Sequence, residues 1–164
     1  MEKMHISASY FLNFYQLLGD NTGVILKYTN VPQPKSAGVY YTMTNGRFPA
    51  ETITNSEAAC KLQTNKAIHP FAFRVHTHEI GTAVSGWKVS KDMKWTLLGR
   101  KDPQLPQMFY PVADNSTIMT NGDRLATRCT MDNFNEHAVC FFNFGSIFQL
   151  MLKYISINRK INFE

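Results

Sequence analysis

Hydrophobic and polar residues alternate with a period of two in several short segments, which is the pattern of a half-buried β-strand. This pattern predicts strands over residues 24–28 and 68–78. A segment rich in Val, Tyr and Thr predicts a strand over residues 38–43, and further short strands are predicted over residues 82–89, 95–98 and 125–131. Turn signals lie between them, namely Asn45-Gly46, Asn121-Gly122-Asp123 and a long loop punctuated by Pro103, Pro106 and Pro111. Short strands separated by turns predict an all-β domain built as an antiparallel sandwich or barrel.

The segment from Cys140 onward has a different character. Its apolar residues are packed into a short run that Asn143, Gly145, Ser146 and Gln149 interrupt. A membrane-spanning helix needs about 20 predominantly apolar residues, so we expect no membrane span here. The run predicts either a core helix or a tail that stands outside the domain.

Composition narrows the class of protein. The chain has 164 residues, of which 44% are hydrophobic and 18% charged, and its 12 Phe, 7 Tyr and 2 Trp favour strands in one globular domain. The formal net charge is +5, but the basic residues are scattered. A nucleic-acid-binding surface needs a basic cluster with stacking aromatics, so we expect no nucleic-acid partner. The N-terminal residues do not form a clean secretory signal.

The cysteines are candidates for a disulfide, and one asparagine is a candidate for N-glycosylation. Cys60, Cys129 and Cys140 are too few for a thiolate metal site of C-x-x-C spacing, and they allow one disulfide with one thiol left over. The sequence does not decide which two would pair. Asn115-Ser116-Thr117 fits the N-glycosylation acceptor pattern, which matters if the chain is exported.

His76 and His78 flank Thr77 on the predicted strand 68–78. Side chains alternate between the two faces of a strand, so Phe71, Phe73, Val75 and Thr77 would share one face and Ala72, Arg74, His76 and His78 the other. Alternate side chains are about 7 Å apart, so two imidazoles can reach one metal ion. Neutral imidazole suits copper, zinc, iron or nickel, and the guanidinium of Arg74 suits an anionic substrate group. The sequence therefore predicts a two-histidine metal site.

Several blocks of sequence surround this pair. They run from Pro70-Phe71-Ala72-Phe73-Arg74-Val75-His76-Thr77-His78 through Val84-Ser85-Gly86-Trp87 and Trp95-Thr96-Leu97-Leu98-Gly99-Arg100 to Gln104-Leu105-Pro106-Gln107. Further blocks are Phe109-Tyr110-Pro111-Val112, Gly122-Asp123 and Arg128-Cys129. Together they resemble the copper type II, ascorbate-dependent monooxygenases, and among them the peptidylglycine α-hydroxylating branch. A cupin, the competing β-barrel metalloprotein, fits less well because Glu79 follows His78 immediately and no matching histidine motif lies downstream.

The resemblance implies an enzyme that hydroxylates the Cα of a C-terminal glycine in peptides, the first step of peptide amidation, with copper, ascorbate and dioxygen. It implies a β-sandwich (jelly-roll-like) domain, with His76 and His78 as copper ligands and Arg74 holding the carboxylate of a glycine-extended peptide. Cys60 and Cys129 fall where this domain has disulfide cysteines, and the family works in the secretory pathway. The resemblance divides the chain into an unassigned segment 1–19, the copper domain 20–139 and a divergent tail 140–164.

The sequence also departs from this family. The family's third copper ligand is a methionine in an Asp-Glu-Met-Cys segment that is absent here, and Met131 or Met151 would have to replace it. The electron-supplying copper domain, with its adjacent histidines, is not seen either, and we interpret His69 and His137 as structural or exposed. The alternative is therefore a non-catalytic or inactive fragment that binds copper or a peptide carboxylate only.

Overall fold

The computed structural model describes residues 5–8, 24–28, 30–31, 34–135 and 140–155. The chain divides into two compact units, residues 1–35 and 36–164. In the first unit, β1 (His5–Ala8) pairs antiparallel with β2 (Val24–Lys27). Within the described part of the chain, no helix is long and apolar enough to cross a membrane.

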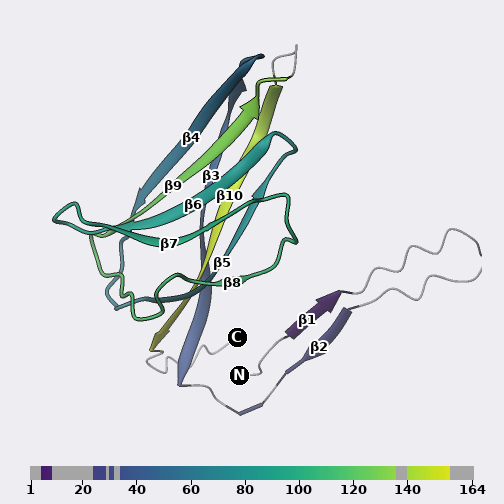
Figure 1. The fold of residues 1–164 in the computed structure, drawn as a ribbon. Coiled ribbons are helices and arrows are strands. Elements are labelled where there is room, and N and C mark those ends of the chain that lie inside the picture. Colours follow the sequence, from purple (N-terminus) through teal and green to yellow (C-terminus); the bar gives the residue numbers. More distant parts are fainter. Residues whose placement is uncertain (1–4, 9–23, 29, 32–33, 136–139, 156–164) are drawn as a thin grey trace, which may run out of the picture. The chain divides into compact units, whose positions relative to one another are not determined.

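The second unit contains two four-stranded sheets (Figure 1). One has the order β3 (Lys35–Phe48), β10 (Cys140–Ile155), β5 (His69–Thr77) and β8 (Tyr110–Pro111). The other has the order β4 (Thr52–Lys61), β9 (Arg124–Asn133), β6 (Gly81–Val89) and β7 (Trp95–Lys101). The predicted all-β antiparallel sandwich is therefore confirmed.

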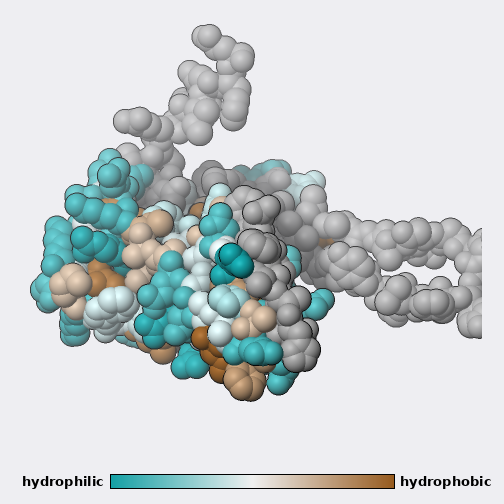
Figure 2. Space-filling model, turned by 90° about the horizontal axis from the view of Figure 1, so that it is seen from above, coloured by the Kyte–Doolittle hydropathy of each residue, from teal (hydrophilic) through white to brown (hydrophobic). Residues whose placement is uncertain are grey.

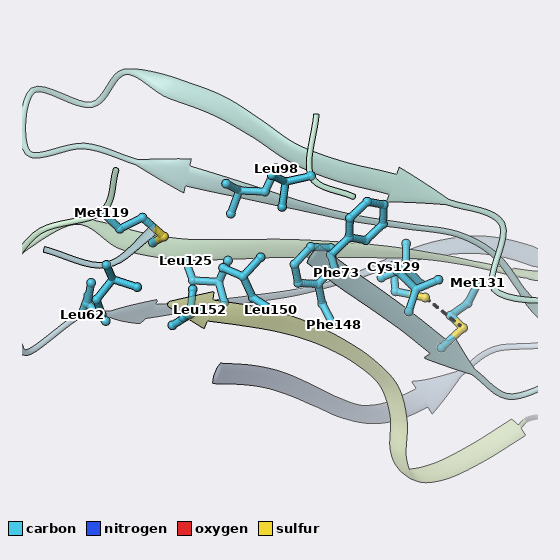
Figure 3. Close-up of a cluster of buried hydrophobic side chains, with 14 of the residues drawn as sticks. Leu62, Phe73, Leu98, Met119, Leu125, Cys129, Met131, Phe148, Leu150 and Leu152 are labelled. Carbon is cyan, nitrogen blue, oxygen red and sulfur yellow. Dashed lines mark hydrogen bonds between the residues drawn. The ribbon is translucent and has the colours of Figure 1, made fainter. Parts of the chain in front are cut away.

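The core between the sheets is built by residues that alternate along the strands. Phe73 on β5 and Phe148 on β10 stack with ring centroids 5.6 Å apart and an interplanar angle of 9° (Figure 3). Two glycines of the opposite sheet make room for these rings. A Cβ on Gly86 would lie 2.3 Å from Phe148 Cζ, and one on Gly99 would lie 2.3 Å from Phe73 Cε1. The stacked rings of one sheet thus fit against bare backbone of the other.

Exposed apolar side chains occur on several elements, and Val39, Tyr41 and Met43 alternate along the exposed face of β3. Figure 2 shows one face, on which hydrophobic areas are interspersed with hydrophilic residues. The largest exposed fractions among the apolar side chains of the second unit belong to Ile53 (61%), Met93 (60%) and Phe134 (60%), which come from different elements.

The prediction of a turn at Asn45-Gly46 is wrong. Both residues lie inside β3, and the chain reverses only at residues 49–51, where Glu51 has a φ of 55°. The buried amide of Asn133 donates to the carbonyl oxygens of Phe48 (3.2 Å) and Pro49 (2.8 Å) and fixes the reversal there. The strand that follows, β4, was not predicted, because its small and polar side chains give no apolar alternation. The turn predicted at Asn121-Gly122-Asp123 is confirmed, with Gly122 at a φ of 91°.

The C-terminal segment is also different from the expected core helix or separate tail. Residues 140–155 form β10, which pairs with β5 in the register Ile147↔His76 and Gln149↔Arg74. Phe148, Leu150 and Leu152 belong to the buried core, whereas Ile147 and Gln149 are half-buried. The period of two in these residues is the signal of a strand, which the density of apolar residues around them obscured.

Candidate metal centre

The two histidines of the predicted site lie at the end of β5, His76 within the strand and His78 just after it. Val75 and Thr77 are buried, His76 is half-buried and His78 is exposed, as the predicted alternation of faces requires. The two imidazole rings have centroids 6.1 Å apart and an interplanar angle of 60°. Rings at this spacing can both direct a nitrogen at one ion between them.

Arg74 lies two residues before His76 and is held by two glutamines. Its Nε donates to the backbone oxygen of Gln107 at 3.1 Å, and its Nη2 donates to Gln107 Oε1 at 3.0 Å. Its Nη1 donates to Gln149 Oε1 at 3.3 Å. A guanidinium has five N–H donors, so these bonds leave one N–H on each Nη atom, and a carboxylate can accept from these donors.

A loop between β7 and β8 also holds the histidine strand. The side-chain nitrogen of Gln104, Nε2, donates to the backbone oxygens of His78 and Gly81, each at 3.1 Å. Between these two residues the chain turns, and Gly81 N donates to His78 O at 2.9 Å. A Cβ on Gly81 would lie 2.0 Å from Thr77 Oγ1, so only glycine fits the tight turn behind the histidines. Gln104 and Gln107 were not predicted as site residues; the matching block around them was their only signal.

The position beside His76 on the neighbouring strand is apolar. Ile147 is the register partner of His76, and residues directly opposite each other on antiparallel strands share a face. Among the described residues, no group of three His, Cys, Asp or Glu residues could hold a metal ion. The structure therefore brings two imidazoles together, and the described part of the chain gives them no third ligand of these types.

The other predicted ligands lie elsewhere or outside the described residues. Met131 is fully buried in the core, where its Sδ lies 3.7 Å from Cys129 Sγ (Figure 3). Met151 pairs with Ala72, four residues along β10 from Ile147. His69 begins β5 and pairs with Lys153, at the opposite end of that strand from the site. His137 lies outside the described residues.

Cys60 and Cys129 do not pair with each other. They lie on neighbouring strands, but Cys129 is opposite Ser56, and Cys60 is opposite Leu125. An offset of four residues is about 13 Å along a strand, beyond the reach of a disulfide. Cys60 is an exposed free thiol next to Tyr40, where burial first and then this thiol raise the pKa of the phenol. The side chain of Cys140 lies outside the described residues.

Asn115 of the predicted glycosylation pattern is exposed. It lies in the loop that follows β8, where Asp114 accepts hydrogen bonds from the backbone nitrogen and the hydroxyl of Ser116 at 2.9 and 2.7 Å. These bonds hold the pKa of Asp114 below its usual value. The acceptor nitrogen is therefore on the surface of an ordered loop.

Comparison with known proteins shows the family to which the chain belongs. Residues 35–158 match the family described as copper type II ascorbate-dependent monooxygenase, C-terminal domain. The chain belongs to this family. The matched residues include β10.

Curated relatives of this copper monooxygenase domain are much longer proteins. Peptidyl-glycine alpha-amidating monooxygenase B of Xenopus laevis is 47% identical over 112 residues, which are 67% of this chain and 12% of that protein. Peptidylglycine alpha-amidating monooxygenase of Rattus norvegicus is 45% identical over 112 residues, 67% of this chain and 11% of that protein. Among solved structures, the infectious bursal disease virus Gx strain structure aligns with 90% of this chain and 37% of that chain at a TM-score of 0.36 and 9% identity, too low to indicate a shared fold.

The donor set fits a copper ion in part. Two imidazoles on one face suit copper, and Gln107 Oε1 lies 2.9 Å from His76 Nδ1, so the Gln107 side chain orients one of the two rings. A soft third ligand, which favours Cu(I), is not contributed at position 147. His76 and His78 would hold the ion, and its coordination would be completed by water, substrate or another segment.

Proposed function

We propose that this domain holds the peptide and the oxygen-activating copper in a monooxygenase that hydroxylates the Cα of C-terminal glycine residues, with ascorbate as the reductant and dioxygen as the co-substrate. The observation that carries the proposal is the position of Arg74 and His76. They lie on one face of β5, and Gln107 Oε1 is bonded to both side chains. An anionic group on Arg74 is therefore about one strand repeat, about 7 Å, from a metal on His76.

The chain's own residues would position the substrate. Arg74 has one remaining N–H on each Nη atom for a carboxylate, and Gln149 holds the guanidinium from the other side. A terminal glycine bound in this way would lie on the same strand face as His76 and His78. Fixing the reacting carbon next to the metal removes much of the entropic cost of the reaction. Copper at the imidazoles would supply the redox chemistry with dioxygen.

Two binding measurements test the proposal. Copper titration should give one tight site in the wild-type chain that is lost when His76→Ala and His78→Ala are combined. Binding of an N-acetylated peptide ending in glycine should weaken at least tenfold in Arg74→Gln, and the same peptide with a C-terminal amide should bind no better to the wild type than to the variant. Equal copper affinity of the wild type and the double histidine variant would refute the metal site.

A binding module without turnover is the second candidate. It is favoured by Ile147, which lies opposite His76 where a third ligand could be placed. We also propose that turnover needs electrons from a further copper domain and that the protein works in the secretory pathway, as the resemblance to the family implies. An assay with glycine-extended peptide, copper and ascorbate separates the candidates: robust hydroxylation by this chain alone would exclude the non-catalytic module and the need for another domain.

A further inference from the structure

One side-chain oxygen joins the two halves of the site. Gln107 Oε1 lies 3.0 Å from Arg74 Nη2 and 2.9 Å from His76 Nδ1. A guanidinium can only donate hydrogen bonds, so the atom of Gln107 that faces it must be the carbonyl oxygen and not the amide nitrogen. Arg74 thereby fixes the orientation of the Gln107 amide.

The same oxygen then determines the state of the neighbouring histidine. Because Gln107 Oε1 is an acceptor, His76 Nδ1 must carry the proton of the bond that joins them. A neutral imidazole has one protonated nitrogen, so Nε2 of His76 is left with its lone pair free to bind a metal. The histidine is thus held in the tautomer that a metal needs at Nε2 before any metal is present.

The backbone of Gln107 makes this arrangement rigid. Its carbonyl oxygen accepts from Arg74 Nε at 3.1 Å, so the residue receives two bonds from one guanidinium. The loop around it is also tied by Tyr110, whose hydroxyl donates to Pro106 O at 2.7 Å. The Gln107 side chain is exposed, but its position is set on both sides.

We propose that Gln107 is a positioning residue that holds His76 in the Nδ1–H tautomer and links this metal ligand to the anion-binding Arg74. The metal part of this inference rests on the proposed function, whereas the tautomer does not. Loss of a group that orients a metal-binding histidine typically costs 10- to 100-fold in metal affinity, so Gln107→Leu should weaken copper binding by at least about 10-fold.

The variant Gln149→Leu is the matched control. Gln149 also accepts a hydrogen bond from Arg74, but it has no bond to His76. The same chemical change at Gln149 therefore removes one support of the guanidinium and leaves the histidine tautomer unchanged. Gln107→Glu is the conservative variant, because a carboxylate oxygen can still accept from both Arg74 and His76.

The experiment is nitrogen-15 NMR of the metal-free chain, using long-range proton–nitrogen correlations that distinguish the two tautomers of His76, followed by copper titration. We expect the Nδ1–H form in the wild type, Gln149→Leu and Gln107→Glu, and the Nε2–H form to dominate in Gln107→Leu, as it does in an unconstrained histidine. An Nε2–H form in the wild type, or no change in Gln107→Leu, would overturn the inference. If the tautomer shifts but copper affinity does not depend on His76 and His78, the proposed function fails and the positioning role of Gln107 stands.

Discussion

The contact between Phe148 and Gly86 tests whether the C-terminal strand is part of the folded domain. Phe148 is 1% exposed, and its ring occupies the space where a Cβ of Gly86 would be. Truncating a buried phenylalanine to alanine costs about 3–5 kcal/mol through lost transfer energy and the cavity left behind. With a urea m-value of about 2 kcal/mol per molar, Phe148→Ala should lower the unfolding midpoint by about 2 M.

Gly86→Ala perturbs the same contact from the other sheet. Its new Cβ would lie 2.3 Å from Phe148 Cζ, so the ring must move, and overpacking of this kind costs about 1–3 kcal/mol. In a Phe148→Ala background the added methyl group would enter the cavity instead. Gly86→Ala should then cost at least about 1 kcal/mol less than it does in the wild type, which is the coupling expected for residues in direct contact.

Urea denaturation of the wild type, the two single variants and the double variant measures both quantities. Ile53→Thr is the control, because Ile53 is 61% exposed on β4 and its replacement should change the free energy of unfolding by no more than about 0.5 kcal/mol. The reasoning would be refuted if Phe148→Ala cost less than 1 kcal/mol or if the two changes were simply additive. Either result would mean that Phe148 of β10 does not pack between the two sheets as described.

Three further substitutions test the turn behind the histidines, a buried carboxylate and the position opposite His76. Gly81→Ala should destabilise the domain by about 2 kcal/mol and weaken copper binding, because its Cβ meets Thr77 Oγ1; unchanged copper titrations would contradict this. Asp123→Asn should cost about 1–3 kcal/mol in urea denaturation, because Asp123 is 3% exposed and its Oδ2 lies 3.4 Å from Lys88 Nζ; a neutral result would contradict it. Ile147→Met should raise Cu(I) affinity at least tenfold by adding a thioether opposite His76, whereas Ile147→Leu should not.

The sequence predicted those parts of the site that depend on local geometry. Arg74, His76 and His78 share a face because a strand alternates, and this needs no knowledge of the rest of the fold. Gln107 and Gln149 could not be found in this way. In the sequence Gln107 is 31 residues from His76, and Gln149 is 75 residues from Arg74. Only the pairing of the strands and the path of the loop bring them to the site.

In the fold, too, the features set by local sequence were predicted and those set by distant contacts were not. The strand around Phe73 was predicted with its alternation of faces, which reflects a buried face. The turn at Asn45-Gly46 was wrong because a local preference was overridden by the buried Asn133, which ends β3 after Phe48 through bonds to a distant part of the chain. Neither the residues at Asn45-Gly46 nor those at the true reversal, 49–51, indicate the contact with Asn133.

The register of β10 connects the core to the site. Successive side chains of a strand point to opposite faces, so a shift of one residue would place Phe148 beside His76 and move Gln149 away from Arg74. The stacking of Phe148 on Phe73 and its fit against Gly86 hold the strand in the observed register. Those buried contacts therefore determine that an amide supports the arginine and that an aliphatic side chain lies beside the histidine. The side chains that line the proposed metal site are thus determined by packing on the other face of the same strand.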